Sequence, residues 1–240
     1  MLTTKLERAL CSSAAAWAVA VAGTAWAGDV VPLRPDTVEP VNVEVAAVDY
    51  EGRPALRLTE KPGVAAEADS LAVIPGLVFG DGTIEIDVAG APRADSFEGA
   101  RGFVGVAFRL QKDPSRYECL YIRPKNGRAE DQLRRNHSTQ YVSHPEHPWH
   151  RLRREAPGVY ESYVDLVSGE WTRLKIVVAG TEARLFVHDA EQPCLIVKDL
   201  KLGDSEGAVA LWIGAGTEGH FANLRVTRQV SGASPAPIGP

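Results

Sequence analysis

The sequence predicts an all-β protein, a single domain in which two antiparallel sheets stack as a sandwich. Between residues 41 and 228, apolar and polar residues alternate again and again with the two-residue period of a half-buried strand. Almost no stretch shows the 3.6-residue period of an amphipathic helix. Strands that follow one another with short turns between them favour a β-sandwich.

The first half of the body contains the clearest strands. Residues 28–40 are rich in proline and predict an extended lead-in. Pro75 and Gly76 interrupt an apolar stretch at 71–79, which should therefore form two short pieces or a bulged edge strand. A polar loop is expected at 89–101. Strands are expected at 41–48, 55–59, 82–88, 102–110 and 117–123.

The second half begins with a long segment, about 124–168, that is rich in Arg, His and Pro and shows no clear period. A connection of this length inside a compact domain predicts a functional loop. The tail at 229–240 consists mainly of Ser, Ala, Pro and Gly and predicts disorder. Further strands are expected at 171–178, 183–188, 195–198, 208–213 and 221–227.

The N-terminus resembles a secretory signal peptide. Lys5 and Arg8 precede an uncharged apolar stretch, and Ala25-Trp26-Ala27 is a small-x-small cleavage site. The apolar stretch is too short and too rich in alanine for a confident membrane span. We therefore expect cleavage after residue 27, a secreted or periplasmic location, and no membrane attachment of the remaining 213 residues.

The charge of the chain argues against nucleic-acid binding. The whole sequence carries −5, and loss of the leader with Lys5, Arg8 and Glu7 makes it −6. Two cysteines follow the leader, Cys119 and Cys194. An oxidising compartment permits a disulfide between them, and two separate buried thiols are the alternative. The oligomeric state is not predicted.

The closing strands carry a family resemblance. Gly207-Ala-Val-Ala-Leu-Trp-Ile-Gly214 and Phe221-Ala-Asn-Leu-Arg-Val226 resemble the last strands of the concanavalin A-like lectin/glucanase superfamily, and the likeness extends over about residues 40–228. It is nearest to laminin-G-like and 3-keto-disaccharide hydrolase-like exported domains. The resemblance implies a jelly-roll sandwich that binds a ligand, usually a saccharide, on its concave sheet or on the loops at its rim.

Glu85 and Asp87 are the candidate catalytic residues. They lie two positions apart on one strand, so their Cα atoms should be about 6.6 Å apart. Such a spacing suits paired glycosidase carboxylates of either stereochemistry. Laminarinase-type enzymes carry Glu-x-Asp-x-Glu, whereas Ala89 and Gly90 follow here, so the third carboxylate is absent. The alternatives are a solvated outer strand face, or cross-strand ion pairs between Arg109 and the two acids.

Several basic and aromatic residues are candidate ligand-binding residues. We expect Arg109, on its own strand, to share a surface with the two acids and with side chains of the next strand. Aromatic rings stack on the apolar faces of sugars, and charged groups bind their hydroxyls. The full set consists of Arg109, Tyr117, Tyr121, Arg123, Tyr141, Trp149 and His150. Trp171 and Trp212 lie in strands and are expected in the core.

The segment 123–154 is strongly basic, with eight Lys and Arg residues against three acidic ones, a net charge of +5. Such an excess suits carboxylate, phosphate or sulfate groups, and a solvated loop folded onto an acidic body is the alternative. Four histidines, His137, His144, His147 and His150, could be ligands of zinc or copper. Pro145 and Pro148 break their spacing, so no metal cofactor is expected. Calcium, frequent in the superfamily, has no Asp-rich motif here.

Three functions are compatible with these features. The first is an exported carbohydrate-binding domain for acidic, plant or bacterial polysaccharide. The second is a glycoside hydrolase of the same fold, and whether the protein is an enzyme is left open. The third is a laminin-G-like protein-interaction module that uses the basic loop. No P-loop, dinucleotide fingerprint or Gly-x-Ser-x-Gly motif is present.

Overall fold

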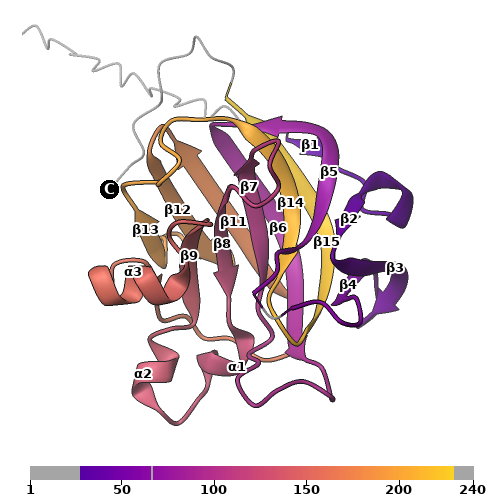
Figure 1. Ribbon diagram of the computed structural model, residues 1–240, viewed down its shortest axis with the longest axis horizontal. Helices are drawn as coiled ribbons and strands as arrows, with labels where there is room; N and C mark the ends of the chain where they lie inside the picture. Colours follow the sequence, from indigo (N-terminus) through magenta and orange to yellow (C-terminus); the bar gives the residue numbers. More distant parts are fainter. Residues whose placement is uncertain (1–27, 66, 230–240) are drawn as a thin grey trace, which may run out of the picture.

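A computed structural model describes residues 28–65 and 67–229. The predicted leader, 1–27, and nearly all of the predicted tail lie outside these residues. Two antiparallel sheets stack face to face, with three short helices gathered at one side of the sandwich (Figure 1). This arrangement confirms the prediction of a two-sheet antiparallel jelly-roll sandwich. No helix in the described parts of the chain is long and apolar enough to cross a membrane.

We call the first sheet sheet A. Its strand order is β13-β12-β11-β6-β15-β4-β3, and β1 pairs with β15. The strands are β1 (Asp29–Val30), β3 (Val43–Tyr50), β4 (Arg53–Glu60), β6 (Gly82–Pro92), β11 (Thr172–Ala179), β12 (Glu182–Val187), β13 (Leu195–Val197) and β15 (Thr217–Arg228).

The second sheet, sheet B, has the order β10-β9-β8-β7-β14-β5-β2. Its strands are β2 (Glu39–Val41), β5 (Ser70–Phe79), β7 (Val104–Leu110), β8 (Tyr117–Ile122), β9 (Thr139–His144), β10 (Glu161–Ser162) and β14 (Gly207–Ile213). The helical elements are the 3₁₀ turn η1 (Pro35–Thr37) and the helices α1 (Pro124–Gly127), α2 (Gln132–Arg135) and α3 (Trp149–Glu155).

The core lies between the sheets and follows the predicted alternation. Ile84, Ile86 and Val88 of β6 are fully buried and pack in one cluster with Val104 and Phe108 of β7. Each such side chain stabilises the fold by about 1.5–3 kcal/mol relative to exposure. The residues between them on each strand point away from the core, toward the outer face of their own sheet.

The segment 124–168 is not the irregular loop that was predicted. It contains β9, which extends sheet B by pairing Cys119 with Val142 and Tyr117 with His144, and it contains all three α-helices. Helix α3 packs against β9, whereas α1 contacts β6 and α2 at the end of the sandwich (Figure 1). The polar residues of β9 show no apolar alternation, so nothing in the sequence indicates a strand there. These residues are instead satisfied by hydrogen bonds to side chains and backbone from other parts of the chain.

Three smaller expectations need correction. The lead-in at 28–40 contains β1, η1 and β2, because its backbone pairs with the edges of β15 and β5. Strand β5 is continuous, and its predicted bulge lies around Pro75 and Gly76, where the register against β14 shifts between Val78 and Ile74. Strand β6 continues to Pro92, so the expected polar loop begins later than residue 89.

Both cysteines of the described chain are free thiols. Burial raises the pKa of Cys119 well above its ordinary value and that of Cys194 to about 12. The alternative of two separate thiols therefore describes this structure, with Cys119 buried and Cys194 partly buried.

Candidate functional site

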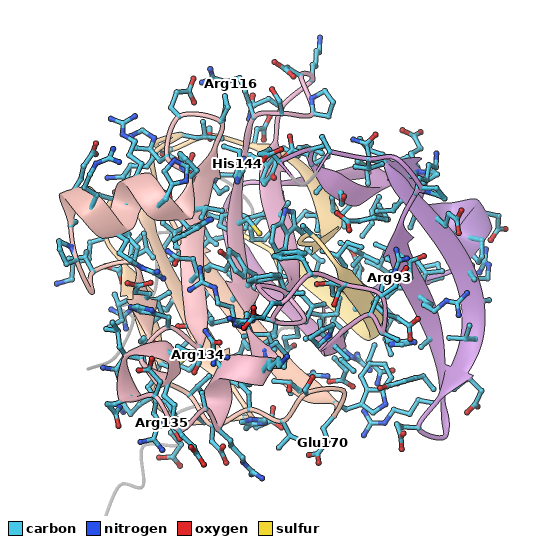
Figure 2. The ribbon with its side chains drawn as sticks, turned by 60° about the horizontal axis from the view of Figure 1, so that its bottom comes forward. Arg93, Arg116, Arg134, Arg135, His144 and Glu170 are labelled. Atoms are coloured by element: carbon cyan, nitrogen blue, oxygen red, sulfur yellow. The ribbon has the colours of Figure 1, made fainter. Side chains whose placement is uncertain are left out.

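A groove of about 910 Å³ crosses the outer face of sheet B. Its floor is formed by β8, β9 and β14. One wall is formed by α3 and the residues before it, and the rest by residues around 97–103, 67–69 and 213–215. His144 and Arg134 lie at opposite ends of the strands of sheet B, near the two ends of the groove (Figure 2).

The floor of the groove is aromatic. The rings of Tyr121 and Trp212 pack with centroids 4.6 Å apart, and Phe103 contacts Tyr121 edge to face at 6.3 Å. The indole N–H of Trp212 donates to the hydroxyl of Tyr117 at 3.2 Å, which fixes the plane of the indole. Trp212 was expected in the core. It faces outward because Leu211 and Ile213, its neighbours on β14, occupy the core positions of the strand.

One end of the groove holds an acid, a phenol and an imidazole. Tyr117 donates a hydrogen bond to Asp69, and Nδ1 of His144 lies 3.6 Å from Oδ1 of Asp69. The ring of His144 stacks on Tyr117 at 5.0 Å. Burial raises the pKa values of Asp69 and Tyr117 and lowers that of His144. Asp69 and His144, whose side chains are partly exposed, can form hydrogen bonds with a polyhydroxylated ligand, whereas the fully buried Tyr117 holds them in place.

The other end is built around the buried carboxylate of Glu161, whose side chain is 3% exposed. Arg153 binds it with Nη2 at 2.6 Å from Oε2, and Nε2 of His137 lies 3.1 Å from Oε1. Arg123 lies 3.8 Å away and donates to Tyr121 and Gln140, both at 3.0 Å. This network holds two guanidinium groups rigidly at the side of the aromatic floor.

Helix α3 supplies an exposed ring above this network. Trp149 and Arg153 are four residues apart, so they lie on the same face of the helix. The guanidinium of Arg153 lies 4.9 Å from the centre of the Trp149 ring, and that of Arg123 lies 5.9 Å from it. Trp149 is 45% exposed. Its indole is thus held at the rim of the groove with its surface open to a ligand.

Five of the predicted ligand-binding residues line this one groove: Tyr117, Tyr121, Arg123, Trp149 and His150. Tyr141, although it precedes the groove residue Val142 in β9, points the other way. Its ring is fully buried in the core, and its hydroxyl donates to Glu118 at 2.5 Å and accepts from the backbone N–H of Lys201 at 2.9 Å.

Arg109 does not share a surface with the other candidates. Its φ of 53° puts it in the left-handed region, at the point where the pairing of β7 with β14 slips. The fully buried guanidinium donates to the backbone oxygens of Gly80 and Gly180 and to Asp81. Arg109 therefore fixes the loops at one end of the sandwich and is shielded from any ligand.

Glu85 and Asp87 lie on the outer face of sheet A, on the opposite side of the sandwich from the groove, so the expected common surface is wrong. Arg173 bridges the two acids, at 3.2 Å from each. Asp87 also accepts from Arg53 at 3.2 Å and from Asn223 at 2.6 Å. Neither acid lines the groove. Both acids thus lie on an outer strand face, as one alternative from the sequence had it, but their ion-pair partners are Arg53 and Arg173 and not Arg109.

Sequence reasoning missed several groove residues, notably Trp212, Asp69, Phe103, Arg101 and Arg134. Alternation along 208–213 was sufficient to place Trp212 opposite Leu211. The other four residues lie outside regular strands, so their place beside the groove follows only from how the sandwich folds. Within residues 28–65 and 67–229, no group of three or more His, Cys, Asp or Glu side chains is placed to hold a metal ion.

No protein-family model matches this sequence, and no curated protein matches it significantly. Solved structures do. The carbohydrate-binding module CBM66 from Bacillus subtilis superposes with a TM-score of 0.55 at 16% identity, over 78% of this chain and 93% of that one. The VIP36 exoplasmic/lumenal domain, in its Ca²⁺/Man3GlcNAc-bound form, gives 0.50 at 9% identity, over 83% and 86%. At these identities the likeness shows the fold, which is that of the jelly-roll sandwiches.

Proposed function

We propose that the protein is an exported carbohydrate-binding domain of the concanavalin A-like type that holds a polysaccharide in the groove of sheet B. The observation that carries this proposal is the Trp212 ring on the groove floor, which is partly exposed and packs on the nearly buried ring of Tyr121. An indole in this position covers the apolar face of a pyranose, while the surrounding guanidinium and imidazole groups bind its hydroxyls. Plant and bacterial polysaccharides, acidic ones included, are the ligands that an exported domain would meet.

The two similar structures support the proposal, because one is a carbohydrate-binding module and the other a sugar-bound domain. The leader expected at residues 1–27 supports export. Binding is favoured over hydrolysis because the one carboxylate pair that the sequence offered is bound by arginines outside the groove.

The test is a polysaccharide binding measurement on the protein and on two tryptophan variants. Trp212→Ala removes half of the aromatic floor, and loss of a central aromatic contact should weaken binding by roughly 30-fold, or about 2 kcal/mol. Trp171→Ala is the matched control, because this indole lies near sheet A and donates to the backbone oxygen of Tyr50. Equal losses in both variants, or no binding by the parent protein across neutral and acidic polysaccharides, would refute the proposal.

A further inference from the structure

Two arginines of the groove have no carboxylate partner. Arg101 donates only to backbone oxygens, those of Glu98 and Ala100. The guanidinium of Arg134, in α2, forms no hydrogen bond or ion pair with any described residue, and its Nε atom is buried; only the backbone N–H of Arg134 donates, to Asp131. A buried guanidinium donor without an acceptor is costly, and such groups are normally satisfied by a partner.

The neighbouring arginines behave differently. Arg153 and Arg123 share the carboxylate of Glu161, Arg128 binds Asp165 at 2.8 Å, and Arg151 binds Glu155 at 2.9 Å. The net charge of +5 noted in the sequence at 123–154 is therefore not a diffuse property of a solvated loop. Much of it is neutralised locally, whereas Arg134 and its neighbour across the groove, Arg101, are not paired with a carboxylate.

These two cations also affect each other. Burial lowers the pKa of Arg101, and the positive charges of Arg134 and Arg123 lower it further, while Glu98 offsets this only in part. The acidic residues that line the groove, Glu67 and Asp69, belong to the region of Tyr117 and His144, at its other end. The end with Arg101 and Arg134 is thus an unneutralised positive pocket beside the aromatic floor.

We propose that Arg101 and Arg134 form a carboxylate-binding subsite and that the polysaccharide in the groove is a polyuronate. The inference rests on the proposed function and assigns its ligand class. A guanidinium presents a planar fork of donors that matches both oxygens of a carboxylate. A hexuronate supplies that carboxylate on the rim of a ring whose apolar face can lie on the indole of Trp212. Neutral glycans leave both guanidinium groups without an acceptor, so they bind less tightly.

The test compares polygalacturonate with its fully methyl-esterified form, because esterification removes the charge and keeps the sugar backbone. Alginate serves as a second polyuronate. We expect the acidic forms to bind at least 10-fold more tightly, and Arg134→Gln to reduce their affinity by roughly 10- to 100-fold. Binding of the ester should change little in this variant. Since the Arg134 guanidinium has no protein partner to lose, the Tm of the variant should also stay unchanged.

Arg135→Gln is the matched control, because Arg135 adjoins Arg134 in α2 and also has a buried Nε without an acceptor, yet it donates from Nη2 to Gln132 and does not line the groove. Equal losses of polyuronate affinity in both variants would mean that the ligand responds to the overall positive charge of α2, and this would overturn the subsite. Equal binding of polygalacturonate and its ester would overturn it as well, yet leave the proposed carbohydrate function standing if Trp212→Ala weakens both. Failure of every glycan to bind would refute the function itself.

Discussion

Replacing Glu161 by Gln should be the most destabilising single change at the groove. The Glu161 carboxylate is 3% exposed, receives two close contacts from Arg153 and His137, and lies 3.8 Å from Arg123. Glutamine keeps the shape and removes the charge, so Arg123, itself nearly buried, and Arg153 lose their counterion. Breaking one partner of a buried ion pair costs about 3–5 kcal/mol. For a chain of this size that corresponds to a fall in Tm of about 10 °C.

Urea unfolding at pH 7, followed by tryptophan fluorescence, measures this cost. Asp165→Asn is the matched control. Asp165 binds Arg128 in the same two-point geometry, at 2.8 and 2.9 Å, but the side chains are 53% and 66% exposed. Exposed pairs contribute little to stability. If Glu161→Gln lowers the free energy of unfolding no more than Asp165→Asn does, then burial does not make the Glu161 ion pairs more stabilising than an exposed pair.

Two further predictions concern other parts of the fold. Asp87→Asn should reduce the free energy of unfolding by about 2 kcal/mol, because Arg53, Arg173 and Asn223 lose their shared charged acceptor. Polysaccharide affinity should stay unchanged. A loss of affinity in titration calorimetry would contradict the position of Asp87 outside the groove. Burial lowers the pKa of His220, so the unfolded chain takes up a proton near pH 6.5 that the folded chain still excludes. The free energy of unfolding should thus fall as pH drops from 7.5 to 5, less so in His220→Gln, and an identical slope in the two proteins would refute this cause.

The layers of the fold could be predicted from the sequence because alternation directly reports which face is buried. Ile84, Ile86 and Val88 lie in the core as their two-residue spacing requires. Strand β9 escaped notice because most of its residues are polar, and Tyr141 is its one side chain in the core cluster between the sheets. Gln140 is nonetheless fully buried, and its amide is satisfied by Arg123 and by the backbone oxygens of Tyr141 and Tyr160. Tertiary contacts of that kind leave no periodic signal.

The candidate site was predictable only in part, for related reasons. Tyr117 and Tyr121 are four residues apart on β8, so their presence on one face follows from the period of a strand. The position of Arg109 does not, because a single residue in the left-handed region reverses the alternation around it. Likewise, hydrophobicity alone suggested a core position for Trp212. The alternation along β14 instead places Leu211 and Ile213 in the core and Trp212 on the outer face.

Strand β9 has a consequence for how this surface can change. It fastens the segment with α1, α2 and α3 to β8 through regular backbone pairing, which does not depend on the identity of the side chains in the helices. Substitutions in α2, which has no buried residue, can therefore change the groove wall while the two sheets beneath keep their pairing. Libraries restricted to Gln132–Arg135 would be a practical route to new specificities, whereas the buried Asn126 and Gly127 of α1 should be kept.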